Sequence, residues 1–315
     1  MPTVLITGGT GTVGKRLTQL LLSKGYNVNI LSRAKQKAET VQENKAKGKI
    51  AYFNWDLTKK YIDPLAISSA DFIVHLAGAG VADKRWTEQR KKEILLSRTQ
   101  SCDLLVSSLK EVPNKITAVI SASAIGWYGP DNANYANAPF TETAASYKDF
   151  LGETCQLWED AISPIAQLDK RLVILRTGIV LSNEGGALVE FKKPILFKTA
   201  AVLGNGKQMI SWIHVDDLCN QYIFAIENQQ MDGVFNAVAP NPVSNEKLTL
   251  ALAKKMAGSF FLKIHVPAFL LKMVLGEMSI EVLKSTTVSA QKIQTMGYQF
   301  NFPTIDTALE TFVNH

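Results

Sequence analysis

Three glycines spaced three residues apart, Gly8, Gly11 and Gly14, stand near the start of the chain. Backbone N–H groups at a glycine turn, and at the start of the helix after it, attract phosphate oxygens, and the helix dipole adds to this attraction. The first glycine permits a tight bend, the second lets the backbone approach a pyrophosphate, and the third lets helix and strand pack closely. The pattern predicts a dinucleotide-binding turn; the alternative is a strand-to-helix turn that binds nothing.

The segments on either side of the glycines have the character that this turn requires. Residues 4–6 are apolar and β-branched at two of three positions, which is typical of a buried parallel strand. Residues 15–24 carry leucines at helical spacing, and Gly25 ends the pattern. A strand, a glycine turn and a helix in this order form the context in which such a motif binds a nucleotide.

A second strand is expected at residues 28–31, and it ends at Ser32 and Arg33. In NAD-binding folds an acidic residue near this point binds the ribose hydroxyls. Here Arg33 takes its place, with Lys35 and Lys37 close behind. A guanidinium can bind a 2′-phosphate through two hydrogen bonds, so the missing acid favours NADP. The alternative is a solvated basic loop.

Further apolar segments predict more strands, and small or polar residues follow several of them. The expected strands are residues 49–53, 71–75, 117–120, 172–175 and 233–236. A polar residue just past a strand's carboxyl end can meet the adenine, as Asp56 would, unless it is simply a loop acid. Small residues such as Ala77 and Gly78 let the backbone pass close to a dinucleotide. His75, between strand and loop, is interpreted as a packed histidine rather than a catalyst.

Composition narrows the class of protein. The chain has 315 residues, 46% of them hydrophobic and 20% charged, which is ordinary for a soluble globular protein. No apolar run approaches the ~18 residues of a membrane span, and the N-terminus enters a strand directly, so we expect a cytoplasmic protein with no membrane partner. The net charge is +6 but the lysines are scattered, so no nucleic acid is expected. The cysteines are far apart and lack metal-binding spacing, which indicates reduced core thiols and no metal.

Longer motifs give the chain a family resemblance over nearly its whole length. They read TGGTGTVG, HLAGAGVADKRWTEQRKKEILLSR, SASAIGWYG, DFLGETCQLWE, LRTGIVLS, GNGKQMISWIHVDDL, NAVAPNPVSN, LGEM and GYQFNFP. The chain resembles an atypical branch of the extended short-chain dehydrogenase/reductase superfamily, the YfcH-like group of NAD(P)-dependent epimerase-family proteins. The resemblance implies an α/β fold with a doubly wound, Rossmann-like parallel sheet of about seven strands and a smaller C-terminal substrate lobe.

The resemblance also implies domain limits and cofactor contacts. The dinucleotide-binding domain would span residues 1–178 and receive residues 210–240, leaving 179–209 and 241–315 for the substrate lobe. Asp56 and Leu57 match the superfamily's adenine-contacting pair, and Arg98 would face either the cleft or solvent. The expected cofactor contacts are Gly8, Thr10, Gly11, Thr12, Val13, Gly14, Ser32, Arg33, Asp56, Leu57, Leu76, Ala77, Gly78, Arg98, Ser121 and Arg176.

Four residues are predicted near the substrate. Arg85 and Trp86 precede a long helix, where they could line a pocket mouth, or Trp86 could merely staple the loop to the core. A superfamily interpretation places Gln208 and Trp212 near the substrate lobe, and the alternative for both is a hairpin and its packing. The substrate itself would be a small molecule, such as a nucleotide sugar or another carbonyl compound.

The residues for proton transfer depart from the superfamily pattern. A helix at residues 149–161 should carry tyrosine and lysine spaced YxxxK, but Phe150 and Thr154 stand there, and neither can titrate. In the superfamily a serine or threonine after the strand at 117–120 binds the substrate oxygen. The resemblance therefore implies Ser123, with Ser121 in reserve, and the alternative is small residues that pack beneath a cofactor. Tyr128 is the nearest proton donor in sequence, although an unassisted phenol with pKa near 10 is a poor acid–base at neutral pH.

Two hypotheses follow from this departure. The first is an NADP(H)-dependent oxidoreductase or epimerase, with weak or specialised hydride chemistry involving Ser123 and Tyr128. The second is a non-catalytic NADP(H)-binding redox sensor or regulatory protein. The sequence favours cofactor binding more strongly than catalysis, and it favours no particular oligomeric state.

Overall fold

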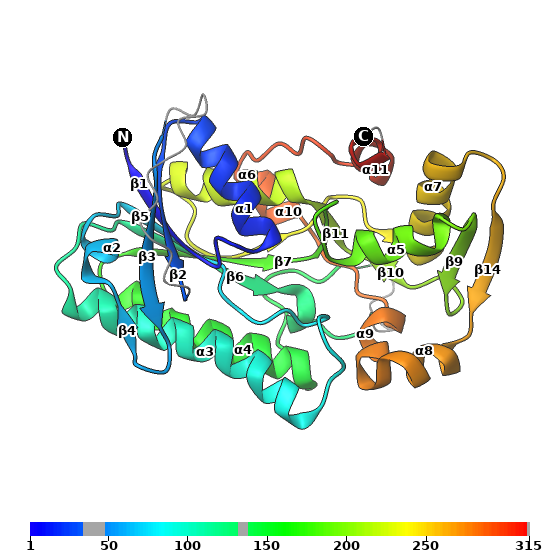
Figure 1. Ribbon diagram of the computed structural model, residues 1–315, viewed down its shortest axis with the longest axis horizontal. Coiled ribbons are helices and arrows are strands. Elements are labelled where there is room, and N and C mark those ends of the chain that lie inside the picture. Colours follow the sequence, from blue (N-terminus) through cyan, green and yellow to red (C-terminus); the bar gives the residue numbers. More distant parts are fainter. Residues whose placement is uncertain (34–47, 132–137, 314–315) are drawn as a thin grey trace.

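Seven parallel strands form the centre of the protein (Figure 1). The computed structural model describes residues 1–33, 48–131 and 138–313. The strands lie in the order β12-β7-β6-β5-β1-β2-β3, and a short antiparallel strand, β4, is added beside β3. Their bounds are β1 Thr3–Thr7, β2 Asn27–Ser32, β3 Ile50–Asp56, β4 Tyr61–Ile62, β5 Phe72–His75, β6 Ala118–Ala124, β7 Arg171–Thr177 and β12 Gly233–Ala237.

The strand order reverses between β1 and β5, so the sheet is doubly wound as the resemblance implied. From β1 the chain builds outward through β2 and β3, then returns to the other side of β1 and continues through β5, β6, β7 and β12. At the reversal, Thr7 at the end of β1 pairs with Leu31 on one side and His75 on the other. In such sheets the crevice outside the carboxyl ends at this point is the usual ligand site.

Helices cover both faces of the sheet (Figure 1). On one face lie α1 (Thr12–Ser23) and α6 (Val215–Glu227), and on the other lie α2 (Pro64–Ser68), α3 (Glu88–Glu111) and α4 (Phe150–Ile162). Side chains alternate along each strand, so Val4 and Ile6 enter the core under α1 and α6, whereas Leu5 enters the core beside α3 and α4. Burial on both faces explains the continuous apolar runs.

A third apolar core holds the C-terminal lobe together, with Leu188, Trp212, Leu248 and Leu309 among its members. Its short sheets pair β8 with β11, β9 with β14 and β10 with β13. Residues 209–214 are therefore divided between two sheets, and the hairpin that was the alternative for Gln208 and Trp212 does not form. The bounds are β8 Ile179–Leu181, α5 Ala187–Ile195, β9 Thr199–Leu203, β10 Met209–Ile210, β11 Trp212–His214, β13 Val243–Ser244, α7 Asn245–Ala257, β14 Leu262–Val266, α8 Ala268–Leu275, α9 Ser279–Leu283, α10 Gln291–Thr295 and α11 Ile305–Val313.

Two further observations concern the chain as a whole. Cys102, Cys155 and Cys219 are buried and free. Of the helices in the described part of the chain, none combines the length and the apolar character that a membrane crossing demands.

Candidate functional site

The glycine turn joins β1 to α1 at the reversal of the sheet. Gly8 adopts a φ of +70°, and its carbonyl accepts a hydrogen bond from the N–H of Gly11 at 3.1 Å. A Cβ on Gly8 would lie 2.9 Å from the backbone of Leu76, and a Cβ on Gly14 would lie 2.3 Å from the carbonyl oxygen of Gly8. The fold itself therefore requires glycine at positions 8 and 14.

Gly11 differs, because its own surroundings do not require glycine. A Cβ there would meet only the carbonyl oxygen of Gly8, at 3.4 Å, and the residue is exposed. Its backbone is extended, it is the N-cap of α1, no side chain caps the helix there, and the first turn carries no acid. Room above Gly11, together with uncapped helix N–H groups, is the arrangement that a pyrophosphate needs, so the turn fits a dinucleotide.

The buried Thr7 and His75 side chains hold the start of the loop that follows β5. The Thr7 hydroxyl accepts hydrogen bonds from the N–H groups of Leu76 and Ala77, at 3.0 and 3.1 Å, and its own hydrogen therefore points to Nδ1 of His75, 2.8 Å away. His75 Nε2 then carries the ring hydrogen and faces Ser101. Burial lowers the pKa of His75 to about 4. His75 is thus a neutral, packed histidine that supports the cofactor loop.

Arg98 reaches this loop from α3. Its guanidinium lies over the Trp158 ring at 4.9 Å and donates to the carbonyl oxygens of Ala79 and Ile94, at 3.0 and 2.9 Å. A Cβ on Gly78 would come within 3.2 Å of it. Burial lowers the pKa of Arg98, and no carboxylate pairs with it in the described parts of the chain. A partly buried cation without a counter-ion favours an anionic ligand nearby.

The ends of β2 and β3 carry the other predicted cofactor contacts. Ser32 is buried and Arg33 is exposed directly after β2, while Lys35 and Lys37 lie outside the described residues. The Asp56 carboxylate accepts hydrogen bonds from the hydroxyl and N–H of Thr58, at 2.6 and 2.9 Å, which lowers its pKa. Asp56 therefore shapes the turn after β3, and Leu57 packs on the core beside it.

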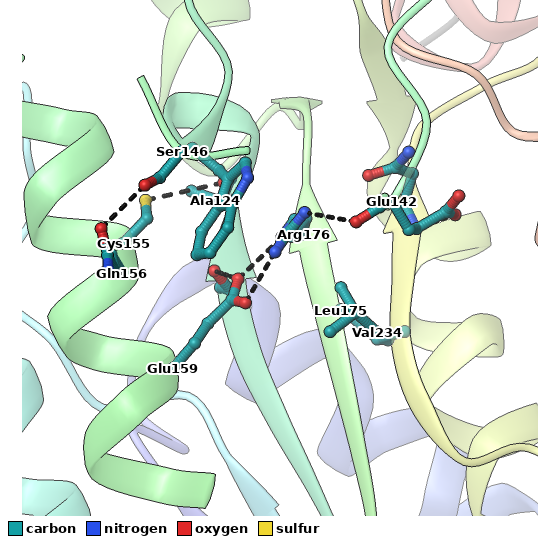
Figure 2. A network of polar contacts seen from close by, with 12 residues as sticks. Ala124, Glu142, Ser146, Cys155, Gln156, Glu159, Leu175, Arg176 and Val234 are labelled. Carbon is teal, nitrogen blue, oxygen red and sulfur yellow. Dashed lines mark hydrogen bonds and ion pairs between the residues drawn. The ribbon is translucent and has the colours of Figure 1, made fainter. Parts of the chain in front are cut away.

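A buried ion pair joins α4 to β7 below the ends of β6 and β7 (Figure 2). Arg176 donates from Nε and Nη2 to the two carboxylate oxygens of Glu159, both at 2.8 Å. The indole of Trp127 lies 3.6 Å from the guanidinium carbon. The Ser123 hydroxyl donates to Glu159 Oε1 at 2.6 Å, so its hydrogen is committed to the carboxylate.

Tyr128 completes this network from the far side of Arg176. Its hydroxyl accepts from Nη1 of Arg176 at 3.1 Å and donates to Oδ1 of Asn236 at 2.7 Å, and the residue is wholly buried. Burial raises the pKa of Tyr128 to about 12. The same guanidinium nitrogen also donates to the carbonyl oxygen of Glu142 at 3.2 Å (Figure 2).

The structure thus brings Ser123, Tyr128 and Arg176 together, as members of one buried network rather than as separate contacts. Glu159 and Asn236 belong to it and were missed as site residues. Both stand in stretches that carry the family resemblance, DFLGETCQLWE and NAVAPNPVSN, but no local pattern assigns either of them a role. The reserve residue, Ser121, is buried and donates to the carbonyl oxygen of Ala122 at 3.2 Å.

Comparison with known proteins places this geometry in a family. The chain is 35% identical to an epimerase family protein of Staphylococcus aureus (strain MRSA252) over 319 residues, covering all of both chains. Residues 4–150 match the model of the NAD dependent epimerase/dehydratase family, and residues 266–312 match a domain of unknown function, DUF1731. The chain belongs to the epimerase family. The implied placement in an atypical branch of the extended short-chain dehydrogenases/reductases is confirmed.

Two solved structures extend the comparison. The crystal structure of human epimerase family protein SDR39U1 (isoform 2) with NADPH matches with a TM-score of 0.83 and 27% identity, covering 99% of each chain. The nucleoside-diphosphate sugar epimerase from Corynebacterium glutamicum matches with a TM-score of 0.75 and 31% identity, covering 98% of this chain and 57% of that one.

In this epimerase-family chain, Phe150 and Thr154 occupy the positions where the superfamily has tyrosine and lysine. The Phe150 ring packs edge-on against Trp86 at 4.9 Å. The Thr154 hydroxyl donates to the carbonyl oxygen of Phe150 at 2.6 Å. Phe150 also lines an open cavity of about 910 Å³ between the starts of α3 and α4, with Lys91 and Glu277 on its wall.

The four predicted substrate residues lie in different surroundings. Trp86 is buried and donates to the carbonyl oxygen of Val81 at 2.9 Å, which matches its alternative as a staple. Arg85 is exposed and lies against Gly276, whose Cβ would be 2.7 Å from Nε. Gln208 and Trp212 are buried and hydrogen-bond to backbone carbonyls of the C-terminal lobe, as the packing alternative describes.

Proposed function

We propose that the protein binds NADP(H) across the carboxyl ends of β1, β2, β3 and β5. The observation that carries the proposal is the glycine turn, where Gly11 leaves room beside uncapped helix N–H groups although the fold does not need glycine there. The Arg98 guanidinium, which reaches the neighbouring loop from α3 and pairs with no carboxylate of the described residues, supports it, because it supplies positive charge for a phosphate. A related human protein of the same family has been solved with NADPH.

Arg33 is our basis for preferring NADP(H) to NAD(H). It stands exposed at the end of β2, where an acid would otherwise bind the ribose hydroxyls. An exposed guanidinium at this position can donate two hydrogen bonds to a 2′-phosphate, whereas an acidic side chain there would repel it.

We further propose oxidoreductase or epimerase chemistry on a small molecule, such as a nucleotide sugar or another carbonyl compound. Bound NADP(H) would supply the hydride. Because the Ser123 hydrogen goes to Glu159, the Ser123 oxygen is left to accept a hydrogen bond, which suits a substrate hydroxyl better than a carbonyl. Tyr128 would act by holding Arg176, and Arg176 by holding the carboxylate that orients Ser123. The substrate's proton would then leave to water or another substrate group.

The second candidate function is a non-catalytic NADP(H)-binding sensor or regulatory protein. A specific observation favours it: Ser123, Tyr128, Glu159 and Arg176 satisfy one another inside the core, and Phe150 and Thr154 carry no titratable group. The polar groups of this network have their hydrogen-bond and charge partners without a bound substrate.

A substrate screen separates the two functions. The full chain is incubated with NADP⁺ or NADPH and a panel of nucleotide sugars, and absorbance and product chromatography report turnover. We expect a turned-over substrate whose rate falls in Ser123→Ala and Tyr128→Phe and is unchanged in the matched control Ser107→Ala on α3. Full activity in both variants would remove these residues from the chemistry, and tight NADPH binding without turnover would favour the sensor.

A further inference from the structure

Large apolar side chains are exposed together at one end of the molecule. Phe197 is 84% exposed, Phe260 83% and Phe269 67%. They lie on or beside β9, β14 and α8, which form the end opposite β4 and α2 (Figure 1). We call this surface the apolar end; its members are Leu196, Phe197, Phe260, Leu262, Ile264, Phe269, Met273 and Val274.

The pairing of β14 with β9 brings Phe197 close to Phe260 and Leu262 although they are distant in sequence. The strands are parallel, with Leu262 opposite Thr199, and the Leu262 N–H donates to the carbonyl oxygen of Lys198 at 2.8 Å. Residues 196–198 and 260–262 therefore lie side by side. Leu262 and Ile264, two residues apart, share one face of β14, and α8 begins directly after Pro267 at the strand's other end.

The backbone at Lys198 is in a conformation that favours glycine. Its φ is +54°, in a turn where Phe197 and Lys198 donate to the carbonyl oxygens of Pro194 and Ile195. A non-glycine residue in this region carries a strain cost, and such strain is found most often where a segment has a function. This turn leaves the Phe197 side chain exposed to solvent next to Lys198.

The apolar end is formed by two basic runs of the sequence. Residues 191–215 and 247–276 contain nine lysines and no aspartate or glutamate. The whole chain has 34 lysines and arginines against 28 acids. The residues outside these two runs, taken together, therefore carry three more acids than bases. Lys193, Lys255 and Lys263 pair with acids outside these runs. Lys198, Lys254 and Lys272 are exposed and make no ion pair with any described residue.

We infer that the apolar end docks on an anionic lipid bilayer, with its phenylalanines in the interface and its lysines facing the headgroups. Exposed phenylalanine, leucine and methionine lie near Lys198, Lys254 and Lys272, which make no ion pair with any described residue. Apolar side chains interleaved with such lysines form the pattern that inserts at a charged membrane surface. A second copy of the chain is disfavoured, because pairing this face with itself would oppose lysine to lysine. This inference is independent of the cofactor site and needs no membrane-spanning segment.

Vesicle flotation tests the inference with the full-length protein. Wild type is floated with vesicles of phosphatidylcholine alone, or of phosphatidylcholine mixed with phosphatidylglycerol, at low and high salt. We expect binding only to the phosphatidylglycerol vesicles, weakened by salt. Phe197→Ser/Phe269→Ser should reduce the partition coefficient about tenfold or more, because two buried aromatic side chains are lost. Lys198→Glu/Lys272→Glu should reduce it about as much.

Matched controls lie at a distance from the apolar end. Leu65→Ser removes a side chain that is 61% exposed on α2, and Lys110→Glu reverses an exposed charge on α3; both should bind vesicles like wild type. Equal melting temperatures would show that all variants fold. Failure of wild type to float with phosphatidylglycerol vesicles overturns the inference. Loss in the lysine variant alone would show adsorption by charge without insertion and would overturn the role of the phenylalanines. A dimer abolished by Phe197→Ser/Phe269→Ser would indicate a second copy.

Discussion

The glycine turn after β1 and the Glu159–Arg176 network beside β6 and β7 lie at the same end of the sheet. They differ in whether their polar groups have partners within the protein. At the turn, the helix N–H groups are uncapped and Gly11 is exposed. Arg98, which reaches the neighbouring loop from α3, has no carboxylate partner in the described chain. In the network, the Arg176 guanidinium contacts three oxygen-bearing partners and an aromatic ring. Ser123, Tyr128, Glu159 and Arg176 are all buried.

This difference indicates that the two regions have different dependences on a ligand. A region whose donors and charges are unpaired gains free energy when an anion arrives, whereas a satisfied network gains little and mainly holds the fold. We therefore expect cofactor binding and the integrity of the network to respond to separate mutations. The predictions below test that separation.

The largest effect is expected at Gly11. Gly11→Val should abolish NADPH binding, because its side chain would fill the space that the pyrophosphate needs, while the melting temperature stays near that of wild type. Calorimetry and thermal unfolding measure the two. The paired variant Gly14→Ala should unfold at lower temperature instead, because its Cβ would lie 2.3 Å from the Gly8 carbonyl oxygen. Wild-type affinity in Gly11→Val would exclude the turn from the site.

In the Glu159–Arg176 network we expect a mutation to lower stability and to leave NADPH affinity unchanged. Glu159→Gln should lower the free energy of unfolding by about 3–5 kcal/mol, because it leaves the Arg176 charge buried without compensation. Its NADPH affinity should remain near that of wild type. Denaturant unfolding measures the loss, and the double variant Glu159→Met/Arg176→Met should recover much of it. A single variant as stable as wild type would show that the pair is unimportant to the fold.

The histidine beneath the cofactor loop makes this region sensitive to pH. The pKa of His75 is about 4 in the folded protein and about 6.5 in an unfolded chain, so only the unfolded state binds this proton between those values. Stability should therefore fall as pH drops from about 7 to 4, by about 3 kcal/mol from this group. Unfolding of His75→Gln should lack this component, whereas the exposed control His265→Gln should keep it. Identical pH profiles for wild type and His75→Gln would contradict the assignment.

A smaller effect is expected at Arg33. Arg33→Ala should weaken NADPH binding about tenfold or more, because a charged hydrogen-bonded pair with the 2′-phosphate is lost, and should hardly change NADH binding. The control Lys110→Ala removes an exposed charge from α3 and should alter neither affinity. An equal loss for both cofactors would mean that Arg33 contacts a part that they share.

Local sequence patterns predicted the parts that depend on neighbouring residues. All seven parallel strands lie where apolar runs indicated them. The glycine spacing located the turn, because strand, turn and helix are contiguous in the chain.

Features that depend on tertiary contact were not predictable in this way. Glu159 resembles any acid on an amphipathic helix until α4 packs against β6 and brings it to Arg176 on β7, 17 positions away. The short antiparallel strand β4 and the parallel pairing of β9 with β14 also escaped, since neither has a strong local signal. The sequence therefore indicated Ser123 and Tyr128 as separate candidates, without the carboxylate and guanidinium that join them.

The most direct test of the account is a pair of calorimetric titrations of wild-type protein, one with NADPH and one with NADH, in the same buffer. The open region, with its glycine turn, Arg33 in place of an acid, and an unpaired Arg98, predicts that NADPH binds about tenfold or more tightly than NADH. Equal affinities, or no binding of either dinucleotide, would contradict it.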